Sequence, residues 1–141
     1  MTVIPGLYQL LIRLRRPMRI RVGALGECPF PAGWYVYTGS ARAGLVQRVS
    51  RHLRPDKHLR WHIDYLLASA DGVTAFVLPG MRVSECRLHA DLFGGRLLIP
   101  GFGSSDCRCH SHLAHFRRRP QIELMPWTDF VRKQARRRPA V

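Results

Sequence analysis

The sequence predicts an α+β domain in which helices flank a small mixed or antiparallel sheet. A chain of 141 residues, 46% of them hydrophobic, is long enough to bury one core. Strand patterns fill the N-terminal part, and helical patterns are interleaved with further strands after it, which is typical of α+β proteins. We expect residues 1–116 to form the domain and residues 117–141 to form an Arg-rich helix or tail that packs on it or extends from it.

The N-terminal part is expected to hold three strands. Apolar and polar residues alternate from Leu7 to Leu14 and again from Arg19 to Val22, which predicts two strands joined as a hairpin. Residues 23–33 contain three glycines and two prolines and are expected to form a loop. Aromatic and β-branched residues from Trp34 to Thr38 predict a strand that ends at Gly39.

Helical patterns begin after this strand. Leu45, Val49 and Leu53 recur every four residues and predict a helix over 44–54 with one apolar stripe. The later elements are expected to be a helix over 61–70, a strand over 72–78, a helix from its N-cap Ser84 to Phe93, a loop over 100–106, a short strand over 112–116 and a final helix from Pro126.

Basic charge is the strongest feature of the composition. Lys and Arg number 23 against 9 Asp and Glu, so the net charge is +14. Such an excess favours polyanion partners, because each phosphate that a cation neutralises releases a condensed counterion. No helix pattern combines a wide apolar face with a basic one, so nucleic acid is favoured over a membrane surface.

The chain is expected to be cytoplasmic. No apolar run approaches the roughly 20 residues that a membrane span needs. The N-terminus also lacks the succession of basic, apolar and small residues that marks a signal peptide. The four cysteines are therefore expected to be reduced thiols.

Residues that suit phosphate chemistry follow one another along the predicted elements. The first strand opens with Gly6-Leu7-Tyr8, and the strand before the first helix ends with Tyr37-Thr38-Gly39. The next helix carries Arg48 and, four residues later, His52. Glu85 stands alone at the start of the third helix.

This order resembles the GIY-YIG nuclease superfamily. Residues 35–41, 51–54, 61–66, 85–86 and 101–107 extend the resemblance to a compact, largely uncharacterised, DUF123-like branch that is sometimes found near or fused to DNA-repair glycosylases. The resemblance covers residues 6–115 and implies a metal-dependent endonuclease that hydrolyses phosphodiester bonds of branched, flapped or damaged DNA in repair. Ser40 stands where some relatives carry Lys, and the loop between the tyrosine strands is longer than in compact repair members, which bears on substrate geometry.

The same residues have a chemical rationale of their own. The nine carboxylates form no cluster of the kind that a two-metal site requires, whereas Glu85 alone can hold one Mg²⁺ or Mn²⁺ that keeps most of its water. Either Tyr8 or Tyr37 is expected to act as the base, once neighbouring cations lower its pKa from about 10 by roughly 2–3 units. Arg48 would stabilise the transition state, and His52 would relay a proton or contact phosphate.

Residues around this set are expected to contact the nucleic acid through phosphate groups. We assign that role to Ser40, Arg42, Arg51, Ser104 and Ser105. His62 and Asp64 are expected to brace the site from their helix.

The sequence is also compatible with two other functions. The main alternative is a nucleic-acid-binding module that keeps the GIY-YIG-like scaffold without catalysis. The other is an adaptor stabilised by zinc at Cys107, Cys109 and His112. Zinc sites usually separate paired cysteines by about two to four residues. The one-residue separation here disfavours zinc, and a loop that borders the site is the preferred interpretation.

Overall fold

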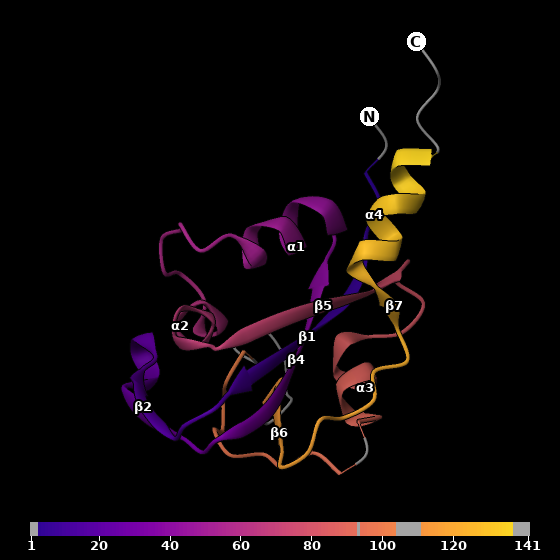
Figure 1. Ribbon diagram of the computed structural model, residues 1–141. Helices are drawn as coiled ribbons and strands as arrows, with labels where there is room; N and C mark the ends of the chain where they lie inside the picture. The colour runs from indigo at the N-terminus through magenta and orange to yellow at the C-terminus, as the bar shows by residue number, and fades with distance from the viewer. Residues whose placement is uncertain (1–2, 93, 104–110, 137–141) are drawn as a thin grey trace.

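The computed structural model describes residues 3–92, 94–103 and 111–136, and its centre is a five-stranded antiparallel sheet (Figure 1). The strand order is β6 (Leu113–Phe116), β4 (Gly33–Ala41), β1 (Gly6–Leu14), β5 (Gly72–Pro79) and β7 (Met125–Pro126). The predicted α+β class is confirmed, and every pairing in the sheet is antiparallel. The central strand β1 lies between β4 and β5 and is buried along almost its whole length.

The described residues form four α-helices around the sheet: α1 (Leu45–Leu53), α2 (His62–Ser69), α3 (Glu85–Ala90) and α4 (Trp127–Arg136). Figure 1 shows α1 and α2 on one side of the sheet and α3 on the other. α3 packs against β4, and α4 packs against β5 and β7. None of these helices is long and apolar enough to cross a membrane.

The core lies mainly between β1 and the two helices α1 and α2. Alternate residues of β1 point to that side, among them Leu10 and Ile12, which are fully buried in the main cluster. Leu11 points the other way and packs with Val36 and Phe116 in a smaller cluster. Both faces of the sheet are therefore covered.

The second strand pairs differently from the prediction. β2 (Met18–Arg21) does not form a hairpin with β1 but pairs with β3 (Glu27–Phe30), in a two-stranded sheet. The predicted loop over 23–33 thus contains a strand, and a short 3-10 helix (Gly23–Leu25) precedes it. Cys28 and Phe30 are buried while Glu27 and Pro29 are exposed, so an alternating pattern was present among the turn-forming residues.

The strand that holds the Tyr-x-Gly motif is longer than predicted. β4 continues through Gly39 to Ala41 instead of ending at the glycine. In the antiparallel register Tyr8 lies opposite Gly39, and a Cβ atom on Gly39 would collide with the Tyr8 ring. Gly39 is therefore a point of close approach within the strand rather than its end.

The apolar stripe of α1 is also shifted by one residue. Leu45 and Val49 are fully buried as predicted, but Leu53 is 37% exposed. The third buried side chain of the helix is His52, which is 2% exposed. The helix thus places a histidine in the core, at a spacing of three residues from Val49.

The C-terminal part returns to the same sheet. α3 ends at Ala90, which is shorter than predicted, while its predicted N-cap Ser84 accepts a hydrogen bond from the Arg87 backbone N–H at 3.1 Å. β6 matches the predicted short strand, and β7 then pairs with β5. α4 follows directly, and its Phe130 is buried in the main core.

The contact between Gly39 and Tyr8 predicts the effect of a single methyl group. Gly39→Ala should lower the free energy of unfolding by about 1–3 kcal/mol, because the new Cβ atom would force the buried ring from its position. Gly72→Ala is the matched control, since a Cβ atom there meets nothing within 4 Å. Urea unfolding of both variants checks this. Equal losses in the two would mean that the Tyr8 ring moves aside freely.

Candidate active-site pocket

A polar pocket of about 210 Å³ lies near the start of β1 and the end of β4. Its lining residues are Tyr8, Tyr37, Gly39, Ser40, Arg48, Arg60, Trp61, His62, Glu85, Gly103 and His112. Four of the five predicted catalytic residues are in this set. The fifth, His52, lies behind Tyr8.

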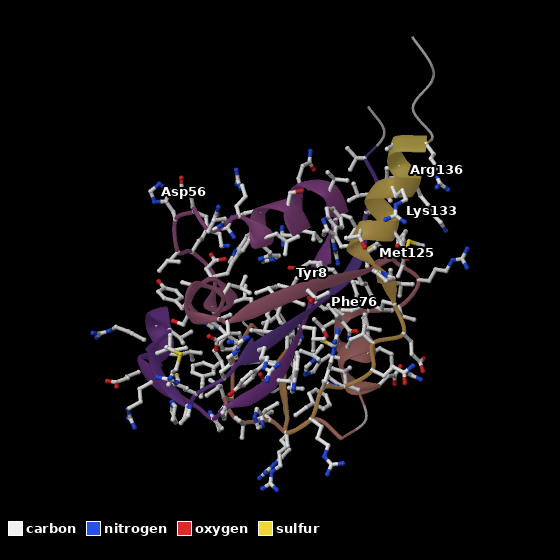
Figure 2. All side chains as sticks on the ribbon, in the orientation of Figure 1. Tyr8, Asp56, Phe76, Met125, Lys133 and Arg136 are labelled. Carbon is white, nitrogen blue, oxygen red and sulfur yellow. The ribbon has the colours of Figure 1, made fainter. Side chains whose placement is uncertain are left out.

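The strand register places the two tyrosines together. Tyr8 faces Gly39 and Leu10 faces Tyr37, so the tyrosines lie diagonally on one face of the β1–β4 pair. Their ring centroids are 6.4 Å apart. Figure 2 shows Tyr8 between α1 and the sheet. Within the described residues the Tyr37 hydroxyl has no hydrogen-bond partner, and it is available to a ligand in the pocket.

Tyr8 is fixed by a buried hydrogen bond to His52. The Tyr8 hydroxyl lies 2.7 Å from His52 Nε2. The pKa of His52 is lowered to about 3, chiefly by burial; Asp64 opposes the shift, and the nearby cations Arg48 and Arg51 contribute to it. His52 is therefore neutral at pH 7 and can accept the hydroxyl proton of Tyr8 as a hydrogen bond. Its Nδ1 atom is buried without a hydrogen-bond partner among the described residues.

Burial dominates the electrostatics of both tyrosines. It raises the pKa of Tyr8, and the positive charge of Arg48 opposes this only in part. Burial likewise raises the pKa of Tyr37 well above its usual value, with Tyr8 and Glu85 adding to the rise. The predicted lowering by adjacent cations of the chain is therefore wrong, because desolvation outweighs Arg48. Both tyrosines are neutral hydrogen-bonding groups when only the protein side chains surround them.

Arg48 is held in a fixed position at the pocket. One guanidinium nitrogen donates to the Ser40 carbonyl oxygen at 3.2 Å, which ties α1 to the end of β4. The guanidinium also lies over the Trp61 ring, 4.5 Å from its centroid. Stacking on an indole leaves the remaining N–H groups free to donate in the plane of the guanidinium.

Asp64 braces this region from α2. Its carboxylate accepts two hydrogen bonds from Arg51, at 2.9 and 3.0 Å, and one each from the backbone N–H groups of Arg60 and Trp61. Burial alone would raise the pKa of Asp64, but these hydrogen bonds lower it below its usual value. The ion pair joins α1 to the start of α2 and so holds Trp61 beside Arg48.

Glu85 reaches the pocket from the opposite face of the sheet. It is the first residue of α3, a helix with no fully buried residue, so its placement depends on polar contacts. His89 Nδ1 lies 3.1 Å from the Thr38 hydroxyl, and the Thr38 oxygen accepts a hydrogen bond from Gln9 Nε2 at 3.2 Å. Burial lowers the pKa of His89 to about 4, so the neutral ring can accept the Thr38 proton. This hydrogen-bonded chain anchors α3 to β4 and β1.

The predicted nucleic-acid contacts are distributed over several places. Ser40 lines the pocket. Arg42 is exposed beside a separate cleft with Met81 and Ser84, and the charge of Arg51 is paired with Asp64. Ser104 and Ser105 lie outside the described residues.

The lining residues that were given no role in ligand binding from the sequence include Arg60, His112 and His62. His62 Nδ1 accepts a hydrogen bond from the Gly103 backbone N–H at 3.0 Å, and burial lowers its pKa. The neutral ring therefore carries its proton on Nε2 and offers a donor. His112 Nδ1 lies 3.8 Å from the Glu85 carboxylate. The block of residues from Trp61 onward was a signal for His62, whereas Arg60 and His112 join the pocket only through the fold.

The sequence offers two candidate metal sites, one at Glu85 and one at Cys107, Cys109 and His112. Glu85 is the carboxylate of the pocket, and a single carboxylate beside an open polar space suits a largely hydrated Mg²⁺ or Mn²⁺. No group of three His, Cys, Asp or Glu residues able to hold a metal occurs in residues 3–92, 94–103 and 111–136. Of the predicted zinc ligands, Cys107 and Cys109 lie outside those ranges. Cys86 is disulfide-bonded, unlike the reduced thiols expected, and Cys28 is free.

Comparison with known proteins gives one match. The family model described as a domain of unknown function, DUF123, matches residues 7–132. The chain belongs to the DUF123 family. The match includes every lining residue of the pocket and extends past His115 to cover β7 and most of α4. No curated protein and no solved structure matches the chain.

The buried neutral state of His52 predicts a pH dependence of stability. Its pKa of about 3 in the folded chain lies below the usual 6.5, so the unfolded chain binds more protons between these values. Stability should fall as the pH drops from about 6.5 toward 3, by up to about 1.4 kcal/mol per pH unit for this one group. His52→Gln, whose amide can still accept from Tyr8, should reduce that slope.

Urea unfolding between pH 6.5 and 4 measures the slope. His58→Gln, a change at an exposed histidine, is the matched control and should keep the slope of the unmodified chain. Identical slopes for His52→Gln and the unmodified chain would show that His52 is already charged in the folded state.

Proposed function

We propose that this protein is a metal-dependent endonuclease that hydrolyses phosphodiester bonds of DNA. The observation that carries the proposal is one pocket that combines two neighbouring tyrosines, an immobilised arginine and a lone carboxylate. These are the residues that the GIY-YIG-like motifs single out, and they come from four separate elements. The net charge of +14 suits a polyanionic substrate.

In this proposal Glu85 holds the metal ion. Mg²⁺ prefers oxygen ligands and keeps several waters, so one carboxylate and a substrate phosphate oxygen suffice. When bound, the ion supplies positive charge beside the phosphate oxygens. The anchoring of α3 through His89 and Thr38 keeps the carboxylate at the pocket.

Arg48 and His62 bind and orient the phosphate. The stacked guanidinium of Arg48 offers N–H donors to the two non-bridging oxygens, where negative charge increases in the transition state. The Nε2–H group of His62 adds a neutral donor from α2. Both donors are already fixed by contacts within the chain, so little reorganisation is needed when charge develops.

Tyr37 orients the attacking water. Its hydroxyl has no partner in the described residues and lines the pocket, so its oxygen can accept a hydrogen bond from water. Tyr8 is held by His52 and restricts the position of Tyr37 from the neighbouring strand. Because burial raises the pKa of both tyrosines, the neutral hydroxyl is the form that performs this orientation.

The raised tyrosine pKa values also favour a second candidate, a nucleic-acid-binding module without catalysis. With both hydroxyls neutral, the pocket would bind a phosphate through donors alone. In that case substitutions in the pocket would change affinity, and no substrate would be cleaved.

Cleavage assays with nicked, flapped, branched and linear DNA separate the two candidates. With Mg²⁺ the chain should cleave at least one substrate, and EDTA should abolish cleavage. Glu85→Gln and Tyr37→Phe should each lower the rate by about 100-fold or more while DNA binding in EDTA is retained.

Matched controls are available for both substitutions. Glu123→Gln removes an exposed carboxylate, and Tyr65→Phe removes a tyrosine hydroxyl away from the pocket; neither should change the rate. Unchanged cleavage in Glu85→Gln would contradict the metal site. Binding without cleavage of any substrate would favour the non-catalytic module.

A further inference from the structure

A second cleft adjoins the candidate active site on the segment between α1 and α2. It has a volume of about 530 Å³ and is lined by Arg51, Arg54, Asp56, Lys57, His58 and Arg60. Arg60 lines both this cleft and the active-site pocket. The two hollows therefore adjoin at Arg60.

The basic residues of this cleft divide into two kinds. Arg51 and Lys57 are half-buried and used by the fold: Arg51 pairs with Asp64, and Lys57 Nζ donates to the carbonyl oxygens of His52 and Arg54. Arg54 and Arg60 are exposed and form no ion pair within the described part of the chain. Their guanidinium groups are free for an external anion.

The surroundings of these arginines are electropositive. Burial lowers the pKa of Lys57, and the positive charges of Arg51 and Arg54 add to this effect while Asp64 opposes it. Asp56 is the acid among the lining residues, and Figure 2 shows it at the outer end of the segment that follows α1. The cations of the cleft outnumber its one acid, and a cleft with net positive charge attracts phosphate groups.

The Trp61 ring packs against arginines of both hollows. The guanidinium groups of Arg48, Arg51 and Arg60 lie 4.5, 4.2 and 5.8 Å from its ring centroid. Arg48 belongs to the active-site pocket, Arg51 to the basic cleft, and Arg60 to both. The Trp61 ring and the ion pair between Arg51 and Asp64 thus set the spacing of these guanidinium groups.

We propose that the basic cleft, through Arg54 and Arg60, binds a phosphate of the substrate strand next to the one that is cleaved. The inference rests on the proposed function, since it assigns the neighbouring phosphate of the same nucleic acid. It implies that the chain holds a strand extending at least one nucleotide beyond the scissile bond. A substrate with a single phosphate would not reach the cleft.

Two substrates of different length test this proposal. Arg54→Gln removes one cationic side chain of the cleft and leaves the backbone groups that bond to Ser50, Arg51 and Lys57 in place. The rate with Mg²⁺ and bis(p-nitrophenyl) phosphate, which has one phosphate, should be unchanged. The Kd for a labelled oligonucleotide in EDTA should rise about 3- to 10-fold at low salt, and the slope of log Kd against log salt should fall by about one.

Arg136→Gln is the matched control, because Arg136 is an exposed arginine on α4, away from Asp56 and its segment (Figure 2). It should keep the Kd and the salt slope of the unmodified chain. A salt slope for Arg54→Gln equal to that of the unmodified chain would overturn the second phosphate site, whether or not DNA is cleaved. If no substrate is cleaved but Arg54→Gln still lowers the slope, the cleft is supported and the catalytic proposal fails.

Discussion

The pocket depends on the absence of a side chain at Gly39. The Tyr8 ring occupies the space over this residue, and Tyr37 lies two residues before Gly39 on the same face of β4. A glycine inside a strand usually costs stability, since it has no side chain to pack. Here the Tyr8 ring packs over Gly39 and replaces the missing side chain. Its hydroxyl hydrogen-bonds to His52.

Around that contact the protein buries polar groups in matched pairs. The contacts of Tyr8 with His52, of Arg51 with Asp64, and of Thr38 with Gln9 and His89 satisfy most of the polar atoms that burial would otherwise leave costly. His52 Nδ1 is the exception, since it has no partner among the described residues. The neutral histidines and the paired Asp64 add little net charge near the pocket. The electrostatic potential that a bound phosphate or cation would experience in the pocket therefore comes mainly from the charges of Arg48, Arg60 and Glu85.

The sequence predicts most of the elements and the centre of the site, because local periodicity and motif order decide them. Prediction from the sequence fails where a tertiary contact overrides a local rule. A glycine normally ends a strand, but β4 continues through Gly39, and Pro29 hides the alternating pattern of β3. The same holds in α1, where spacings of three and four compete and burial selects His52 over Leu53.

The site shows a similar division. Tyr8, Tyr37, Arg48 and Glu85 were predicted, since each belongs to a motif on its own element. The pairing of Arg51 with Asp64 was not predicted, because the two residues lie on different helices. The raised pKa of the tyrosines was also missed, since desolvation depends on how completely α1 and α2 cover the strands.

The most direct measurement is the anomalous diffraction of Mn²⁺ in crystals of the Tyr37→Phe variant with a short oligonucleotide. A manganese peak is expected at the Glu85 carboxylate, with a phosphate within hydrogen-bonding distance of Arg48. Manganese bound without Glu85, or a phosphate seated away from Arg48, would contradict this expectation.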